Sequence, residues 1–287
     1  MSAKTYWIGA IIAVIAAGAL FYFLTQSSSV ESKKTSDTKA DIDATHTSPE
    51  VFTEIPLVTK KVITASDPTH HYTINVTYPE VSLATHEALA AAANDVIEKY
   101  VNDIVADFKS SATGEDITPD PNDASDLTVE FTSELLAPTL ISIRFDESAY
   151  MQGAAHPNNQ ARVLNYNIAN KTVISTAGLF ASSTQALPFL SDYTKVALRK
   201  QFTSEGNEEY SGDLSSGTEP TAENFRAVAI TKTGLLVIFN PYQVASYARG
   251  APEVTIPYTD LDDVINPEIV DAIKAAKENI VEATPML

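Results

Sequence analysis

Hydrophobic and polar positions alternate with a period of two in several stretches of the chain. Tyr72, Ile74, Val76 and Tyr78 are separated by polar residues, which is the pattern of a strand with one buried face. We expect Pro79 to end this strand, because proline donates no bond to a neighbouring strand. Similar alternation, or a short apolar run, predicts further strands at residues 57–63, 127–131, 141–145, 161–168, 173–174, 225–230, 235–239 and 253–256.

Between some of these strands the period changes to 3.6 residues. Residues 89–108 place Val96, Ile97, Val101 and Ile104 on one apolar face and polar side chains on the other. The same pattern predicts helices at residues 187–202 and 267–281, whereas the acidic residues 204–220 are predicted to be an exposed loop. One-sided helices between strands pack on a sheet. The predicted fold class is therefore α+β, with two subunits that each pack helices on a mainly antiparallel sheet.

One stretch has neither period. Residues 7–24, from Trp7 to Leu24, are 18 consecutive uncharged and mostly apolar positions, and a helix of that length can cross the hydrocarbon core of a bilayer. A cleaved signal peptide is the alternative, but no A-x-A site follows the run. We predict one N-terminal transmembrane helix, an uncleaved signal anchor. The protein would then lie in the cell membrane with its large C-terminal part outside the cytoplasm.

Composition divides the rest of the chain. Residues 1–6 form a short N-terminal segment, and residues 25–55 are rich in Ser, Thr, Asp and Lys, which is typical of a flexible linker. We predict an N-terminal α+β subdomain at residues 56–150 and a C-terminal α+β subdomain at residues 151–266. A terminal helix and tail follow at residues 267–287.

Charge and cysteine content narrow the function. The chain has 37 acidic and 19 basic residues and a formal net charge of −18, whereas nucleic-acid binding requires a basic surface. The charge suits a soluble domain and would also attract a cationic partner. The absence of cysteine from the sequence excludes disulfides, thiolate catalysis and cysteine-ligated zinc.

Two loops carry residues that a core does not need, and we expect these loops to lie near each other. Residues 153–159 follow one strand, and residues 240–250 join two buried strands. Tyrosine and arginine in such loops are typical of a recognition surface. The alternative is structural: the tyrosines would pack on the domain, and His156 would hydrogen-bond the backbone beside Pro157. The predicted ligand-binding residues are His156, Pro157, Asn158, Asn240, Pro241, Tyr242, Tyr247 and Arg249.

Catalytic motifs give no support for an enzyme. None of the histidines, at positions 46, 70, 71, 86 and 156, has the spacing of a zinc site. The chain also lacks G-x-S-x-G, a Walker loop and G-x-G-x-x-G. Its carboxylates are abundant, so a glycosidase-type pair stays open as an alternative. We predict no enzymatic activity, no cofactor and no metal site.

Several motifs, taken in order, resemble one known family. They are Tyr78-Pro79, Ala93-Asn94-Asp95, Gly153-Ala154-Ala155-His156-Pro157-Asn158, Asn165, Gly178-Leu179-Phe180, Phe239-Asn240-Pro241-Tyr242, Tyr247-Ala248-Arg249-Gly250 and Ile256-Pro257-Tyr258. This series is similar to an extracytoplasmic α+β domain. That domain is shared by lysozyme-binding membrane anti-sigma factors and by the non-catalytic N-terminal region of some peptidoglycan deacetylases. The resemblance extends over residues 56–266.

The resemblance implies the outer domain alone. Six residues before the span cannot supply the cytoplasmic sigma-binding segment of such anti-sigma factors. The short segment after residue 266 cannot supply the metal-binding catalytic domain of the deacetylases. We expect a membrane-anchored, non-catalytic domain that binds a wall glycan or a cationic wall-active protein such as lysozyme. The alternatives are a hydrolase of envelope polysaccharide, with His156 and a carboxylate as its acid and base, and a structural or accessory subunit of an envelope complex.

Overall fold

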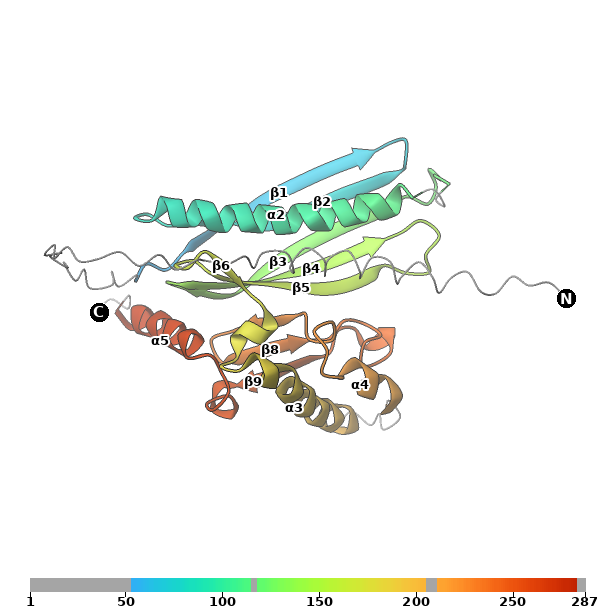
Figure 1. Cartoon of the computed structure of the whole chain (residues 1–287). Coiled ribbons are helices and arrows are strands. Elements are labelled where there is room, and N and C mark those ends of the chain that lie inside the picture. The colour runs from blue at the N-terminus through green and yellow to red at the C-terminus, as the bar shows by residue number, and fades with distance from the viewer. Residues whose placement is uncertain (1–52, 115–117, 205–210, 283–287) are drawn as a thin grey trace, which may run out of the picture. The chain divides into compact units, whose positions relative to one another are not determined.

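A six-stranded sheet forms the centre of the structure (Figure 1). The computed structural model describes residues 53–114, 118–204 and 211–282. Neighbouring strands of the sheet are antiparallel, except that β2 and β3 run parallel. In spatial order the strands are β1 (Leu57–Asp67), β2 (Tyr72–Ser82), β3 (Ser125–Ala137), β4 (Leu140–Tyr150), β5 (Asn158–Asn167) and β6 (Thr172–Ile174).

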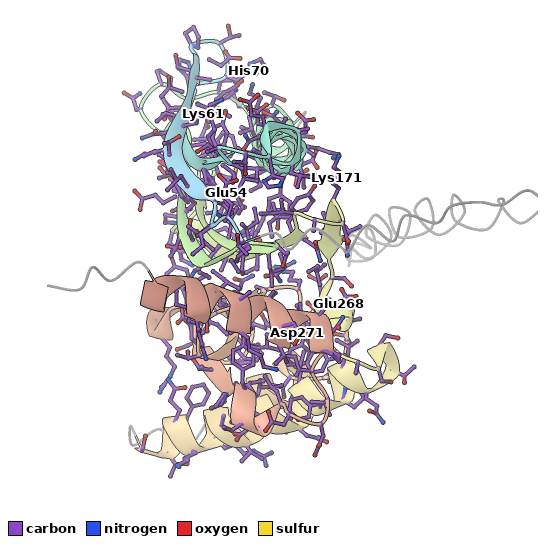
Figure 2. All side chains as sticks on the ribbon, turned by 90° about the vertical axis from the view of Figure 1, so that its left-hand side faces the viewer. Glu54, Lys61, His70, Lys171, Glu268 and Asp271 are labelled. Atoms are coloured by element: carbon purple, nitrogen blue, oxygen red, sulfur yellow. The ribbon has the colours of Figure 1, made fainter. Side chains whose placement is uncertain are left out.

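Helix α2 (Glu87–Ala112) connects the parallel pair and covers one face of the sheet. A parallel pair needs such a crossover because its strands cannot be joined by a short turn. Ile97, Val101 and Ile104 are at most 1% exposed and share one core with the strands, whereas Val96 is only partly buried. Figure 2 looks along α2 and shows it beside the sheet. The helix predicted at residues 89–108 is confirmed and extends beyond both predicted ends.

The other face of the large sheet packs against a second sheet. Figure 1 shows the resulting order of layers: α2, the large sheet, the small sheet and α3. Leu135 and Leu140 of the large sheet are part of the apolar core that lies between the large sheet, the small sheet and α3. Both sheets belong to one compact unit. The elements of the second part are α3 (Ser183–Ser204), α4 (Ser211–Gly217), α5 (Pro267–Glu282) and the antiparallel strands β7 (Val228–Ile230), β8 (Gly234–Ile238) and β9 (Glu253–Pro257).

A buried polar network joins the two sheets. Asn165 on β5 donates from Nδ2 to the carbonyl oxygen of Val228 at 2.8 Å and accepts from the Ser142 hydroxyl at 2.7 Å. The Ser142 oxygen accepts in turn from the backbone N–H of Ile230 at 3.1 Å. Asn165 is 4% exposed and Ser142 is fully buried. Because an unpaired polar group is costly at such depth, this network fixes how the sheets pack.

Two local predictions from the sequence are wrong. β2 does not end at Pro79 but continues to Ser82. β3 pairs only with residues 72–76 of β2, so on that side of β2 no neighbouring strand requires a backbone N–H from Pro79. The acidic stretch 204–220 is not a loop throughout. It contains α4, which buries Leu214 in the core of the small sheet.

The predicted subdomain boundary falls between two neighbouring strands of the large sheet, β4 and β5. β5 and β6 follow the predicted subdomain boundary at residues 150/151, yet both pair in the large sheet. The predicted anchor at residues 7–24 lies outside the described residues. Within residues 53–282, apart from the gaps given above, no helix combines the length and apolar character needed to cross a membrane. The mixed α+β class with a mainly antiparallel large sheet is confirmed.

Candidate ligand-binding surface

The two loops selected from the sequence meet at the start of β5. Residues 153–159 lead into β5, and residues 240–250 connect β8 to β9. The rings of His156 and Tyr247 stack with their centroids 3.9 Å apart, and the ring of Tyr242 lies 5.4 Å from that of Tyr247. Nε2 of His156 is 3.1 Å from the Tyr242 hydroxyl. These three side chains, His156, Tyr242 and Tyr247, are termed the aromatic cluster.

Hydrogen bonds hold the aromatic cluster in place. The Tyr247 hydroxyl donates to the carbonyl oxygen of Pro157 at 3.1 Å and accepts from Nδ2 of Asn159 at 3.0 Å. Nδ1 of His156 lies 2.9 Å from the same carbonyl and donates to it, because a carbonyl oxygen can only accept, and Nε2 faces the Tyr242 hydroxyl. The rings are thus ordered before any ligand arrives, which reduces the entropy cost of binding.

Tyr242 has an exposed side chain and a left-handed backbone conformation. Its side chain is 61% exposed, and its φ of +69° is a left-handed conformation that costs a bulky residue roughly 1–3 kcal/mol. Gly250, at the other end of the loop, has φ +73° and ψ −141°, a combination that glycine adopts far more readily than other residues. Backbone strain beneath an exposed aromatic ring is typical of binding sites.

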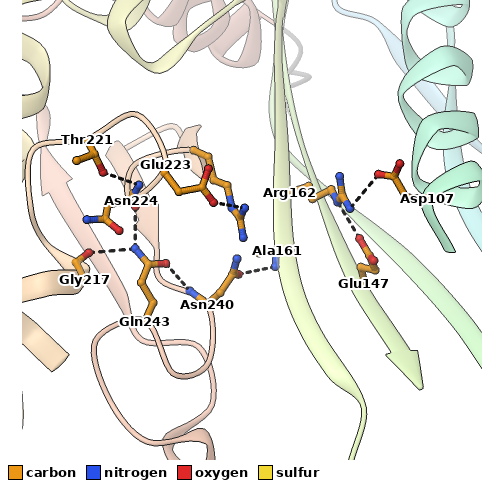
Figure 3. A network of polar contacts seen from close by, with 11 residues as sticks. Asp107, Glu147, Ala161, Arg162, Gly217, Thr221, Glu223, Asn224, Asn240 and Gln243 are labelled. Atoms are coloured by element: carbon orange, nitrogen blue, oxygen red, sulfur yellow. Dashed lines mark hydrogen bonds and ion pairs between the residues drawn. The ribbon is translucent and has the colours of Figure 1, made fainter. Parts of the chain in front are cut away.

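The base of loop 240–250 is anchored to β5 (Figure 3). Asn240 is 8% exposed, and its Oδ1 accepts from the backbone N–H of Ala161 at 2.8 Å. The Gln243 side chain accepts from the Asn240 backbone and donates to the carbonyl of Gly217. A Cβ at Gly217 would overlap the carbonyl oxygen of Gln243. Asn240 therefore fixes the position of the loop from its base, and the exposed ring of Tyr242 is left to face solvent.

A hollow of about 270 Å³ opens beside the aromatic cluster. Its floor is formed by β3, β4 and β5 and its wall by loop 240–250. The polar side chains that line the hollow include Thr128, Glu130, Arg144, Asp146, Ser148 and Asn159, and Pro241 belongs to the wall. Because Asn159 also bonds Tyr247, the hollow and the aromatic cluster form one surface, termed the recognition groove.

Carboxylates lie opposite each other on the floor of the recognition groove. Glu130 and Asp146 are direct cross-strand partners, and like charges at such positions destabilise a sheet. Arg144 offsets the repulsion, donating from Nε to Asp146 at 2.7 Å and from Nη1 to Glu253 at 2.6 Å. Burial lowers the pKa of the Arg144 guanidinium, but these hydrogen bonds outweigh burial and raise it. The groove is thus acidic and rich in acceptors for hydroxyl and ammonium groups.

The other predicted site residues have different surroundings. Asn158 is the exposed first residue of β5, next to the aromatic cluster. Arg249 instead lies over the ring of Phe202 at the end of α3, 4.2 Å from its centroid. The sequence did not identify Glu130 and Asp146 as site residues, because the alternating pattern predicts only that they face solvent on their strands. Only the order of the strands brings these carboxylates together beneath loop 240–250.

The chemistry of the recognition groove favours binding of a polar ligand with flat faces. Aromatic rings offer area for the apolar face of a sugar ring, while amide, hydroxyl and carboxylate groups bond its hydroxyls. Within the described part of the chain, no three histidine, aspartate or glutamate side chains are grouped so that they could hold a metal ion.

Comparison with known proteins divides the chain into two matched regions. A model of the family described as Deacetylase PdaC matches residues 66–159, and one described as Protein of unknown function (DUF3298) matches residues 177–259. The peptidoglycan-N-acetylmuramic acid deacetylase PdaC of Bacillus subtilis is 27% identical over 164 residues, 56% of this chain and 33% of that protein. The immunogenic protein MPB64 of Mycobacterium bovis is 24% identical over 113 residues, 39% of this chain and 47% of that protein. The chain thus spans between a third and about half of these relatives.

Two solved structures share the fold. A DUF3298 family protein from Pseudomonas aeruginosa PAO1 aligns with a TM-score of 0.53 at 12% identity, over 75% of this chain and 94% of that one. A member of the same family from Bacteroides fragilis aligns with a TM-score of 0.52 at 15% identity, over 77% and 99%. His156 and Asn159 lie in the first matched region, and Tyr242 and Tyr247 in the second. The matches confirm the predicted resemblance, because a region similar to Deacetylase PdaC is followed by a region similar to DUF3298.

Proposed function

We propose that the protein is a membrane-anchored, extracytoplasmic domain that binds a glycan of the cell envelope without cleaving it. The observation that carries the proposal is the recognition groove, where the rings of His156, Tyr242 and Tyr247 lie next to a hollow with polar side chains and are joined to it through Asn159. Similarity to a peptidoglycan deacetylase over 56% of this chain supports a wall polymer as the ligand. The part of that relative that is matched is 33% of its length, so its activity is not carried over here.

The geometry suggests how a glycan would lie. The exposed face of Tyr242 would stack on a sugar ring, and the side chains of Glu130 and Asn159 would accept and donate hydrogen bonds to its hydroxyls. Tyr247 would hold the ring of His156 and share the stacking surface. Since these contacts are already ordered by hydrogen bonds within the protein, most of the binding energy would be available for affinity.

A cationic wall-active protein such as lysozyme is the second candidate ligand, and charge is the observation that favours it. The chain has a net charge of −18, and Glu130 and Asp146 line the groove. A lysine or arginine side chain of the partner would enter between these carboxylates. Ionic strength separates the two ligands, because salt screens attraction between proteins of opposite charge but has little effect on stacking against a neutral sugar.

The proposed location rests on the apolar run at residues 7–24. An uncleaved anchor would keep the domain at the outer surface of the membrane, and a flexible linker of the length of residues 25–55 would span roughly 30 Å. Intact-mass analysis of membrane fractions tests this: the mature protein should retain its N-terminus. A mature chain that starts near Ser27 would contradict the anchor.

Co-sedimentation with purified insoluble peptidoglycan tests the function. The full chain in detergent should sediment with the wall, and Tyr242→Ala should reduce the bound fraction at equal protein concentration. Val196→Ala is the matched control, because Val196 is also an exposed apolar side chain, at 68%, but lies on α3. Equal binding by both variants would contradict the proposal. If the wild type releases soluble wall fragments and His156→Ala abolishes this release, the protein is a hydrolase and not a binding domain.

A further inference from the structure

A second, smaller hollow lies at the outer edge of β5. It has a volume of about 130 Å³ and is lined by Tyr100, Gln160, Ala161, Arg162 and Arg226. Two of the 19 basic residues of an acidic chain thus face one concavity. We propose that this arginine pocket binds a carboxylate or phosphate group of the ligand. The identity of the whole ligand rests on the proposed function, whereas anion binding by the pocket does not.

Arg162 is held in place by a buried carboxylate (Figure 3). Its Nε donates to Oε2 of Glu147 at 2.7 Å, and its Nη2 lies 3.7 Å from Oδ2 of Asp107. The Glu147 side chain is only 6% exposed, so it fixes the plane of the guanidinium. An arginine has five N–H donors, and these two contacts leave others able to reach an anion in the pocket.

Arg226 brings the second positive charge from the segment before β7. Its Nη1 donates to Glu223 at 2.6 Å, but the Glu223 side chain is 78% exposed, and such surface pairs are weak. A ligand anion that is less exposed to water can therefore compete for this guanidinium. Burial raises the pKa of Tyr100, and the charges of Arg162 and Arg226 oppose that rise. Both arginine side chains and the Tyr100 ring line the same hollow.

The arginine pocket adjoins the recognition groove. Gln160 and Ala161 line both hollows. β6 pairs only with residues 165–167 of β5, so the edge of β5 before them is not covered by a strand. There the Tyr100 hydroxyl donates to the carbonyl of Val163 at 3.3 Å. A glycan in the groove can therefore extend around this edge, with neutral sugar rings at the aromatic cluster and an acidic substituent at the arginine pair.

Calorimetric titration of the full chain in detergent tests the pocket against three ligands. These are a neutral N-acetylglucosamine oligomer, a wall glycan of equal length that carries carboxylates, and a polyglycerol phosphate. Arg226→Gln should weaken binding of an acidic ligand about tenfold, the size expected for one charged hydrogen bond, and leave the neutral oligomer unaffected. Arg199→Gln, an exposed arginine on α3, is the control and should change neither. Loss with the carboxylated glycan assigns the carboxylate, and loss with polyglycerol phosphate assigns the phosphate.

A direct probe separates failure of the pocket from failure of the proposed function. At fixed ionic strength, inorganic phosphate or succinate should raise the Tm of the wild type more than chloride does, and Arg226→Gln should remove the difference. Equal Tm values in all three salts, or no change with Arg226→Gln, would overturn the pocket whether or not glycans bind. If anions stabilise the wild type but no glycan binds, the pocket stands and glycan recognition is wrong.

Discussion

The two faces of the large sheet differ in how they are closed. Under α2, Val76, Val129 and Phe145 are fully buried. On the opposite face, the small sheet, α3 and α5 enclose the end near Leu140 in an apolar core. The other end of that face is open, and Glu130 lies there on the floor of the recognition groove. β3 and β4 therefore carry core residues on one face and polar groups for a ligand on the other, because successive side chains of a strand point to opposite sides.

This difference predicts that stability and ligand binding respond to different substitutions. Changes on the closed face should lower the free energy of unfolding and leave the shape of the groove intact in the molecules that remain folded. Changes in the groove should weaken binding with little effect on unfolding, as surface substitutions usually do.

Ile104→Ala should have the largest effect on stability. Ile104 is 1% exposed in the core between α2 and the sheet, and truncation there leaves a cavity. We expect the free energy of unfolding to fall by roughly 2–5 kcal/mol, measured by chemical denaturation. Asn102→Ala, on the exposed face of the same helix, is the control. A loss within about 0.5 kcal/mol for Ile104→Ala would mean that α2 does not close this face.

Asn165→Ala should have the second-largest effect on stability. It removes the bonds to the carbonyl of Val228 and to Ser142, and leaves buried polar groups without partners between the two sheets. We expect a loss of roughly 1–3 kcal/mol in the free energy of unfolding. If the variant is as stable as Asn102→Ala, the network does not hold the sheets together.

Tyr247→Ala should weaken ligand binding and have little effect on the free energy of unfolding. It removes a stacked ring from the aromatic cluster, and we expect affinity for the wall ligand to fall by roughly 1–3 kcal/mol, the range of interface anchors. Tyr247→Phe keeps the ring but loses the hydroxyl bond to Pro157, so its loss should be smaller. His156→Ala should also weaken binding less than Tyr247→Ala. Unchanged affinity with Tyr247→Ala would remove the aromatic cluster from the binding site.

Glu54→Gln should have the smallest effect and should depend on pH. Glu54 accepts from the side chain and the backbone of Thr85 and from the backbone of Ala84. The Thr85 hydroxyl first, then the His86 ring and the backbone bonds, lower the pKa of its carboxyl from 4.5 to about 2. A lowered folded-state pKa stabilises the protein above the unfolded value, so the contribution is present above about pH 5 and is lost towards about pH 2. The difference in unfolding free energy between wild type and Glu54→Gln should shrink over that range. A difference independent of pH would show that the carboxylate is not held there.

Much of the fold could be predicted from the periodicity of side chains. The face formed by Ile97, Val101 and Ile104 is complete within one helix, so the sequence alone was sufficient to locate α2. The prediction that β2 ends at Pro79 was wrong, because the cost of a missing backbone donor depends on whether a neighbouring strand lies alongside it. The order of strands, with β3 returning parallel to β2, requires long-range pairing that no local pattern encodes.

The candidate site could be predicted in the same uneven way. Glycine, proline and tyrosine mark both loops within a few residues, and the structure brings His156 and Tyr247 into contact across 91 positions of chain separation. The surroundings of Arg249 could not be predicted, because they depend on the end of α3 meeting loop 240–250. The floor of the recognition groove could not be predicted for a related reason. Glu130 and Asp146 come together only because their strands are neighbours in the sheet.

The most direct test of the central claim is a map of ligand contacts by amide chemical shifts. Residues 50–287, the compact unit, would be labelled with 15N and titrated with soluble peptidoglycan fragments. The largest shifts should fall in residues 153–161 and 240–251, and on β3 and β4 around Glu130 and Asp146. Shifts confined to the hollow between β6 and α5, near Asn170 and Asn266, or no shifts at millimolar ligand, would contradict that claim.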